Sequence, residues 1–220
     1  MALHLKHHHH TSTTFKHLLP PRPTAAPPRP ISLHTRAVLG GRAQELIQSG
    51  AVTPIPPRDA AAAMQSQGYT LLDIRPQWKR EKACVSGSMH VPLFVEDKDN
   101  GPVTLLKKWV HFGYIGLWTG QLLTMINPAF LQQVEEAVLG KDSKLLVACG
   151  EGLRSLMSVA KLHKGGYKNL GWLAGGFTRA SDGDFPAVEG SEKLEYATIG
   201  DASYYFLKLL LLLQAVGKKT

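Results

Sequence analysis

Three short, continuous runs of apolar residues lie in the body of the chain, at 69–74, 144–148 and 170–174. Runs of this length that end in glycine or polar residues are typical of strands buried on both faces. Between them, the segments 128–139 and 154–164 place apolar residues at the spacing of a helix with one buried face. Because strands and helices alternate, we predict an α/β fold: a small parallel sheet with helices on both faces and right-handed crossovers.

The folded part of the chain is expected to span residues 43–190, beginning with two short helical patterns at 43–48 and 58–67. Residues 1–42 differ from it, because they contain no acidic residue, are rich in proline and hold seven of the ten histidines. Acid-poor N-termini that contain arginine and hydroxyl residues are typical of organelle transit peptides. A disordered tail is the plainer alternative, and the run His7–His10 fits either a metal tract or a cloning tag.

The net charge of +8 is concentrated in that N-terminal segment. Six basic residues precede the first acidic residue, Glu45, and the rest of the chain has 19 basic and 17 acidic residues, a net charge of +2. Nucleic acid is therefore not expected as a partner. His90, His111 and His163 are too dispersed for a metal site, and no metal or cofactor is predicted. Two cysteines argue for a reducing compartment or thiol chemistry, with Cys84 expected to be structural.

The connection 93–127 is longer than a usual link between a strand and a helix. Four aromatic residues follow one another closely in it: Trp109, Phe112, Tyr114 and Trp118. One interpretation is an insertion that packs these aromatic side chains on the core. The other is a docking surface for a protein partner through residues 109–118, or a lid near the active site.

Residues 199–216 form the most apolar part of the chain. As a helix, these 18 residues would span roughly 27 Å, slightly less than the hydrocarbon core of about 30 Å. Lys208 lies near the middle, where a charge is costly inside a bilayer. We expect either membrane association, as an anchor or a helix lying on the membrane, or a helix docked on the domain or on a partner.

The strongest chemical signal is the loop after the second apolar run, Cys149-Gly150-Glu151-Gly152-Leu153-Arg154. A strand is predicted to end at Cys149 and a helix to start near Ser155, which places the thiol under a helix N-terminus at the ligand-binding edge of the sheet. Gly150 and Gly152 let backbone N–H groups turn inward as a nest for an anion, and Arg154 adds a full positive charge. These features favour the thiolate, the nucleophilic form of cysteine. A small buried cysteine without chemistry is the alternative.

Four segments resemble the characteristic blocks of rhodanese-type sulfurtransferases and occur in that family's order, within about residues 55–180. They are 72–75 (L-D-V-R in the family), 85–92 (I-P-G-A-x-N-I-P), 149–154 (C-R-x-G-x-R) and 173–177 (L-x-G-G-F/W). In the loop, Cys149, Gly152 and Arg154 match. The resemblance implies a rhodanese-like fold and a two-step reaction, in which Cys149 takes a sulfane sulfur from a small donor and passes it to a thiol or cyanide acceptor.

The resemblance also implies roles for particular residues and a location. Catalysis would fall to Cys149 and Arg154, whereas Asp73 and Arg75 would support the site structurally through charge-assisted hydrogen bonds. The residues implied to bind the substrate follow the cysteine: Gly150, Glu151, Gly152, Leu153 and Ser155. Together with the N-terminal composition, the resemblance implies a chloroplast protein, in the stroma or at the thylakoid membrane.

The loop departs from the family pattern at two positions. Gly150 stands where the family often has arginine, and Glu151 brings a negative charge near the predicted anion site. Because like charges repel, we expect weak activity with thiosulfate. Only four residues separate Cys149 from Arg154, one fewer than in cysteine-dependent phosphatases, which disfavours phosphatase activity. A non-enzymatic docking or sulfur-relay module at the thylakoid membrane is the alternative function.

Overall fold

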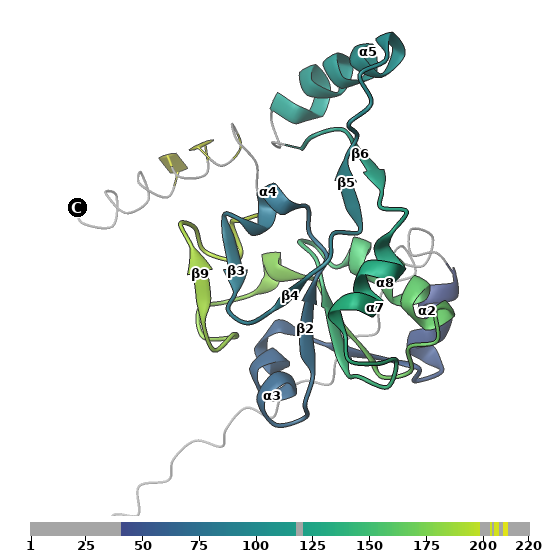
Figure 1. The fold of residues 1–220 in the computed structure, drawn as a ribbon. Coiled ribbons are helices and arrows are strands. Elements are labelled where there is room, and N and C mark those ends of the chain that lie inside the picture. The colour runs from purple at the N-terminus through teal and green to yellow at the C-terminus, as the bar shows by residue number, and fades with distance from the viewer. Residues whose placement is uncertain (1–40, 118–120, 199–202, 204, 207–208, 211–220) are drawn as a thin grey trace, which may run out of the picture. The chain divides into compact units, whose positions relative to one another are not determined.

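Five parallel strands form the central sheet (Figure 1). Across the sheet they follow the order β1 (Val52–Ile55), β8 (Leu170–Leu173), β7 (Leu145–Ala148), β2 (Thr70–Asp73) and β4 (Met89–His90). The computed structural model describes residues 41–117, 121–198, 203, 205, 206, 209 and 210. The predicted α/β fold with a parallel sheet is confirmed.

Helices cover both faces of this sheet. One layer consists of α2 (Gly41–Gln48), α7 (Phe130–Ala137) and α8 (Leu153–Lys164), and the other contains α3 (Ala60–Gln65) and η3 (Phe177–Arg179). Along β7, Leu145 and Val147 pack in the first layer, whereas Leu146 and Ala148 pack in the second. Since both faces are buried, every position of the strand is apolar, which produced the continuous run in the sequence.

The predicted elements are present with shifted ends. The three strands expected from apolar runs are one or two residues shorter than predicted. The predicted helix 58–67 is a 3-10 turn, η1 (Pro57–Asp59), followed by α3. The prediction that a helix starts near Ser155 is wrong by two residues, because Gly152 has a φ of +90° and turns the chain directly into α8 at Leu153.

Two antiparallel strand pairs accompany the central sheet. β3 (Ala83–Val85) pairs with β9 (Val188–Gly190), and β5 (Phe94–Glu96) pairs with β6 (Thr124–Ile126). Between β5 and β6 the chain forms α5 (Pro102–His111) and one π-helical turn, η2 (Phe112–Gly116). The predicted insertion 93–127 is thus a strand pair that carries a helix. Cys84 lies on β3 and is half-buried.

The aromatic side chains of this insertion are exposed. Trp109 is 75% exposed, Phe112 57% and Tyr114 85%, whereas Trp118 lies outside the described residues. The interpretation that these side chains pack on the core is therefore wrong for the three that are described. The physical reason is the orientation of α5, whose polar side chains make the hydrogen bonds to the rest of the insertion.

β2 and β7 are neighbours in the sheet although they are distant in the sequence. From β2 the chain continues to β4 on one side, and from β7 it continues to β8 on the other. Such a divergence opens a crevice beyond the carboxyl ends of the two strands, where ligands bind in open α/β sheets. Asp73 ends β2 and Cys149 directly follows β7, so both lie at this edge.

The two ends of the chain fall largely outside the described residues. Of the predicted transit segment 1–42, only Gly41 and Arg42 are described, and they begin α2. Of the predicted apolar helix 199–216, the described residues are helical: 203, 205, 206, 209 and 210. None of the helices in the described part of the chain reaches the length and apolarity that a bilayer crossing requires.

Candidate active site

Cys149 is held by backbone amides of the loop that follows it. Its side chain is only 2% exposed. The N–H of Gly152 donates to its Sγ at 3.1 Å, and the N–H of Ser155 donates at 3.3 Å. Two N–H groups converging on one sulfur at the start of a helix stabilise negative charge on that atom. Two backbone N–H groups, those of Gly152 and Ser155, therefore point at the sulfur, as a nest requires.

The hydroxyl of Ser155 completes the contacts of the sulfur. Its Oγ lies 3.4 Å from Cys149 Sγ and donates to the carbonyl of Gly152 at 2.9 Å. Because the hydroxyl proton is engaged there, an oxygen lone pair can accept the S–H proton of the thiol. When the thiol is ionised, the same hydroxyl can rotate and donate to the sulfur. The Ser155 hydroxyl can thus form a hydrogen bond with Cys149 Sγ both when Cys149 is a thiol and when it is a thiolate.

The loop rests on the turn that follows β8. The carbonyl of Cys149 accepts the N–H of Phe177 at 3.0 Å, and the carbonyl of Gly150 accepts the N–H of Thr178 at 2.9 Å. Gly176 has a φ of +66°, and a Cβ there would come within 2.3 Å of the Gly150 carbonyl oxygen. The sequence indicated the glycines of this turn, but it indicated neither their contact with the loop after Cys149 nor the hydrogen bond of Thr178.

A pocket of about 300 Å³ opens above the sulfur. The loop that begins at Cys149 contributes Cys149, Gly150, Glu151, Leu153 and Arg154 to its lining. The other lining residues come from elsewhere in the sequence: Arg75, Pro76, Lys79, Gln121 and Thr198. Lys79 is buried, and its Nζ donates to the carbonyl of Thr198 at 3.3 Å. Three cationic side chains and one carboxylate therefore line the pocket, which favours an anionic ligand.

Arg154 lines this pocket but points toward the insertion. Its Nη2 donates to Gln121 Oε1 at 3.3 Å, and its Cζ lies 5.2 Å from the centroid of the Phe94 ring. Its positive charge therefore acts from the pocket wall, whereas the hydrogen bonds to Cys149 Sγ among the described residues come from Gly152 and Ser155. The sequence held no signal for the pairing with Gln121.

Gly150 and Glu151, the two positions at which the loop departs from the family pattern, each have a distinct environment in the structure. Glu151 is exposed and lines the pocket, as expected for a charge near the anion site. Gly150 lies against Thr198, because a Cβ on Gly150 would come within 2.7 Å of Thr198 Cγ2. A side chain at position 150 therefore requires Thr198 to move. That contact joins two segments far apart in the sequence.

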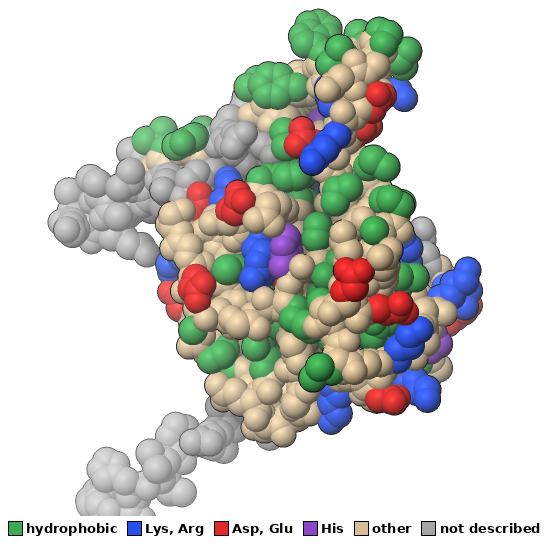
Figure 2. Space-filling model, viewed as in Figure 1, with side chains coloured by type: hydrophobic (Ala, Val, Ile, Leu, Met, Phe, Trp, Pro, Cys, Tyr) green, Lys and Arg blue, Asp and Glu red, His purple; other side chains and the backbone are tan. Residues whose placement is uncertain are grey.

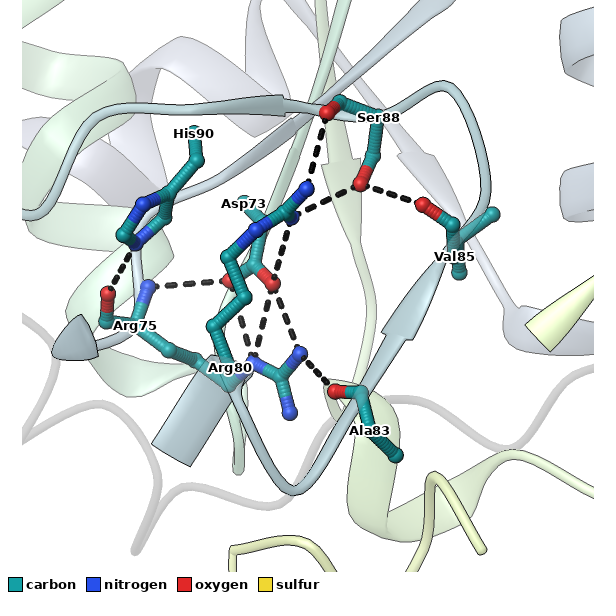
Figure 3. Close-up of polar contacts among 7 residues, drawn as sticks. All are labelled: Asp73, Arg75, Arg80, Ala83, Val85, Ser88 and His90. Atoms are coloured by element: carbon teal, nitrogen blue, oxygen red, sulfur yellow. Dashed lines mark hydrogen bonds and ion pairs between the residues drawn. The ribbon is translucent and has the colours of Figure 1, made fainter. Parts of the chain in front are cut away.

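Asp73 and Arg75 form a buried ion pair beside the pocket (Figure 3). Arg75 Nη2 donates to Asp73 Oδ2 at 2.7 Å and to the carbonyl of Ala83 at 2.7 Å. The helix α4 (Gln77–Arg80) adds Arg80, whose Nη1 lies 3.4 Å from the same carboxylate oxygen and donates to Ser88 at 2.8 Å. These bonds tie the end of β2 to the next two segments, an arrangement that fits the predicted supporting role.

Metal binding has no support in the described part of the chain. Its histidine, cysteine, aspartate and glutamate side chains form no cluster of three that could hold an ion. His90 instead lies within hydrogen-bond distance of the carbonyl of Arg75, with its Nε2 at 2.8 Å (Figure 3).

Sequence comparisons with known proteins identify the family of this chain. Residues 56–182 match the family described as rhodanese-like domain. Rhodanese-like domain-containing protein 10 of Arabidopsis thaliana is 64% identical over 177 residues, which are 80% of this chain and 83% of that protein. Rhodanese-like domain-containing protein 11, chloroplastic, of the same plant is 41% identical over 160 residues, 73% of this chain and only 54% of that longer protein. A rhodanese-like domain from Anabaena, solved by NMR, is 14% identical over 62% of this chain and 78% of its own, with a TM-score of 0.42.

Proposed function

Because this chain belongs to the rhodanese-like domain family, we propose that it transfers a sulfane sulfur from a donor to a thiol or cyanide acceptor through a persulfide on Cys149. The observation that carries the proposal is the pair of amides, from Gly152 and Ser155, that donate to Cys149 Sγ beneath an open pocket. These donors stabilise the negative charge of the thiolate, the attacking form of Cys149, at the base of the pocket.

The reaction needs no redox partner. In the first step, the Cys149 thiolate attacks the outer sulfur of the donor, the donor S–S bond breaks, and its electron pair leaves with the remnant, which is sulfite when thiosulfate is the donor. In the second step, an acceptor thiolate or cyanide attacks the terminal sulfur of the persulfide. The Cys149 thiolate then leaves with the electron pair of the broken S–S bond, and the original enzyme is restored.

The pocket suits this chemistry through its charge and its size. The terminal sulfur of a persulfide on Cys149 would extend into the 300 Å³ space. Lys79, on α4, and Arg154, on α8, line that space and attract anionic donors, whereas the negative charge of Glu151 repels such donors. We therefore expect a donor whose negative charge lies away from Glu151, and slow turnover with thiosulfate.

The direct test is mass spectrometry of the full chain after incubation with thiosulfate or a low-molecular-weight persulfide. We expect the mass to rise by one sulfur atom, localised to Cys149 by peptide mapping. Cys149→Ser should abolish the increase, and Cys84→Ser, which alters the other cysteine, should retain it. The proposal fails if no sulfur is added to Cys149, or if the Cys149→Ser variant takes up as much sulfur as the unaltered chain.

A sulfur-relay module with little turnover is the second candidate function. It is favoured by the 2% exposure of Cys149, which restricts the approach of an acceptor, and by Glu151 on the pocket lining. Under this alternative, Cys149 would become persulfidated but cyanide or small thiols would release the sulfur no faster than they release it from an unfolded chain. A rate of thiocyanate formation that depends on the folded protein would exclude it.

We extend the proposal to the compartment and place the protein in plastids. The support is the acid-free composition of residues 1–42 and the chloroplastic designation of the related protein 11. Fusing residues 1–42 to a fluorescent protein in plant cells tests it. Fluorescence inside plastids is expected, and diffuse cytosolic fluorescence would contradict the proposal.

A further inference from the structure

The helix α5 presents a broad apolar face to its surroundings. Its exposed large apolar residues continue into η2: Val103, Leu105, Leu106, Trp109, Val110 and Phe112. In the space-filling view, hydrophobic side chains gather over α5 (Figure 2). Helices of soluble domains normally turn such a face inward, and exposed apolar patches of this extent mark interaction sites.

The polar side of α5 explains this orientation. Asp99 accepts a hydrogen bond from the Thr104 hydroxyl, Lys108 Nζ donates to Asn100 Oδ1 at 3.3 Å, and His111 Nε2 lies 3.0 Å from the carbonyl of Gln121. These bonds hold the polar face toward the ends of the insertion. The apolar face consequently points away from them.

The charge of this region is as unusual as its apolarity. No acidic residue occurs between Asp99 and Glu135, whereas Lys107 and Lys108 lie on α5. In helical projection the two lysines flank the polar face. Lys107 is exposed, so its long side chain can reach outward, whereas Lys108 is half-buried and bonded to Asn100. A basic polar face opposite an apolar face with aromatic residues is the pattern of helices that lie in a membrane interface.

We propose that α5 and η2 dock on the surface of a lipid bilayer that contains anionic lipids. The segment Pro102–Gly116 would lie along the interface over roughly 22 Å, with its apolar side chains among the acyl chains and Lys107 and Lys108 near the headgroups. Trp109 and Tyr114 have the amphipathic rings that are enriched at this depth. The two lysines, and the lack of acidic residues between Asp99 and Glu135, complement the negative charge of anionic headgroups, which is why we commit to a bilayer as the occupant.

The docking surface is linked to the catalytic pocket. Gln121, whose carbonyl lies within hydrogen-bond distance of His111, lines the pocket and accepts a hydrogen bond from Arg154. A docked α5 would thus hold the wall of the pocket that carries Gln121 beside the lipid surface. This inference goes beyond the proposed sulfur transfer and does not depend on it, because membrane binding is measured without any donor.

Vesicle flotation of the full chain tests the proposal. We expect the chain to float with vesicles of phosphatidylcholine and phosphatidylglycerol, and less with phosphatidylcholine alone. Leu106→Gln combined with Trp109→Gln should lower the bound fraction by about tenfold, because binding scales with the buried apolar area. Lys107→Gln combined with Lys108→Gln should abolish the preference for phosphatidylglycerol.

A matched control alters exposed apolar side chains outside the insertion. Leu139 and Met157 are exposed, so Leu139→Gln combined with Met157→Gln should bind vesicles as the unaltered chain does. If the Leu106/Trp109 variant bound vesicles as well as the unaltered chain does, the proposal would be overturned and binding would be assigned to another segment, such as 199–216. If the unaltered chain instead forms dimers that this variant dissolves, and does not float, a second copy of the chain occupies the face and the proposal is wrong.

Discussion

Trp172 on β8 donates a hydrogen bond from its indole Nε1 to the carbonyl of Gly152, in the loop after β7, at 2.9 Å. The same carbonyl accepts the Ser155 hydroxyl at 2.9 Å and the N–H of Leu156 at 3.2 Å. The N–H of Gly152 in turn donates to Cys149 Sγ. The strand β8 therefore helps to hold in place Gly152, the residue whose N–H donates to Cys149 Sγ.

Replacing the indole tests this link. Trp172→Phe should keep the packing but remove the donor, so we expect the free energy of unfolding to fall by about 0.5–1.5 kcal/mol. The rate of persulfide formation should fall severalfold, because the Gly152 amide is held less firmly. Trp78→Phe is the control, since the indole Nε1 of Trp78 is buried without a hydrogen-bond partner among the described residues. Equal rates in the two variants would argue against a role for the Trp172 bond.

Gly176→Ala should damage the catalytic loop. Gly176 combines a φ of +66° with a Cβ position 2.3 Å from the Gly150 carbonyl oxygen, so a methyl group must displace the loop. Gly183→Ala is the control, because Gly183 has a φ of +96° but open space around its Cβ position. We expect the control to lose about 1–2 kcal/mol of stability from backbone strain alone. Gly176→Ala should lose more and should also abolish persulfide formation at temperatures where it remains folded.

Glu151→Arg should raise turnover of thiosulfate and cyanide. Replacing a carboxylate on the pocket lining with a guanidinium turns repulsion of an anionic donor into attraction, which we expect to raise kcat/KM on the order of tenfold. Glu151→Gln should lie between the two. The measurement is the initial rate of thiocyanate formation at low and high salt, because the gain should shrink as salt screens the charges. An unchanged or lower rate would show that the charge of Glu151 does not limit the reaction.

Asp73→Asn should strongly destabilise the fold. The substitution leaves the Arg75 guanidinium buried without its carboxylate partner, which typically costs about 3–5 kcal/mol. Asp182→Asn is the control, since Asp182 pairs with Lys193 where both side chains are largely exposed, and we expect almost no change there. Denaturant unfolding of both variants makes the comparison. A small loss for Asp73→Asn would mean that the ion pair contributes little to stability.

The start of α5 should respond to pH through Asp99. The Thr104 hydroxyl, followed by the Gly101 amide, donates to this carboxylate and holds the pKa of Asp99 below its ordinary value. Its stabilising effect is therefore present above the ordinary pKa of an aspartate and is lost as the pH falls through the lowered value. Thr104→Ala should raise the pKa of Asp99 toward the ordinary value, as measured by NMR titration of the carboxyl carbon. Thr70→Ala, outside the insertion, should leave it unchanged.

Local patterns in the sequence were sufficient to predict the central strands and the place of Cys149 at the end of β7. The strands β2, β7 and β8 are buried on both faces, so each had to be a continuous apolar run. The glycines after Cys149 indicated a loop of unusual backbone conformation, and Gly152 does adopt a positive φ. These inferences succeeded because each depends on a few consecutive residues and their own conformational preferences.

The helix α5 shows where such patterns were insufficient. No helix was predicted within 93–127, although the apolar and aromatic residues of α5 have the spacing of a core-facing helix. That spacing is the same whichever way the helix is turned. Three polar contacts, made by Thr104, Lys108 and His111, determine that the apolar face points outward. Periodicity reports that a helix has two faces, but it does not report which of them meets the rest of the protein.

The amino-acid order alone therefore establishes a parallel sheet and a cysteine at its carboxyl edge, because strand burial and glycine conformation are local properties. The folded arrangement brings Trp172 to the loop carbonyl, Thr198 against Gly150, and Gln121 to Arg154. Each of these contacts joins segments that are distant in the chain, and the first of them exists because β7 and β8 are neighbours in the sheet. Hydrogen bonds and close packing act over a few ångströms in space, so linear spacing carries no record of them.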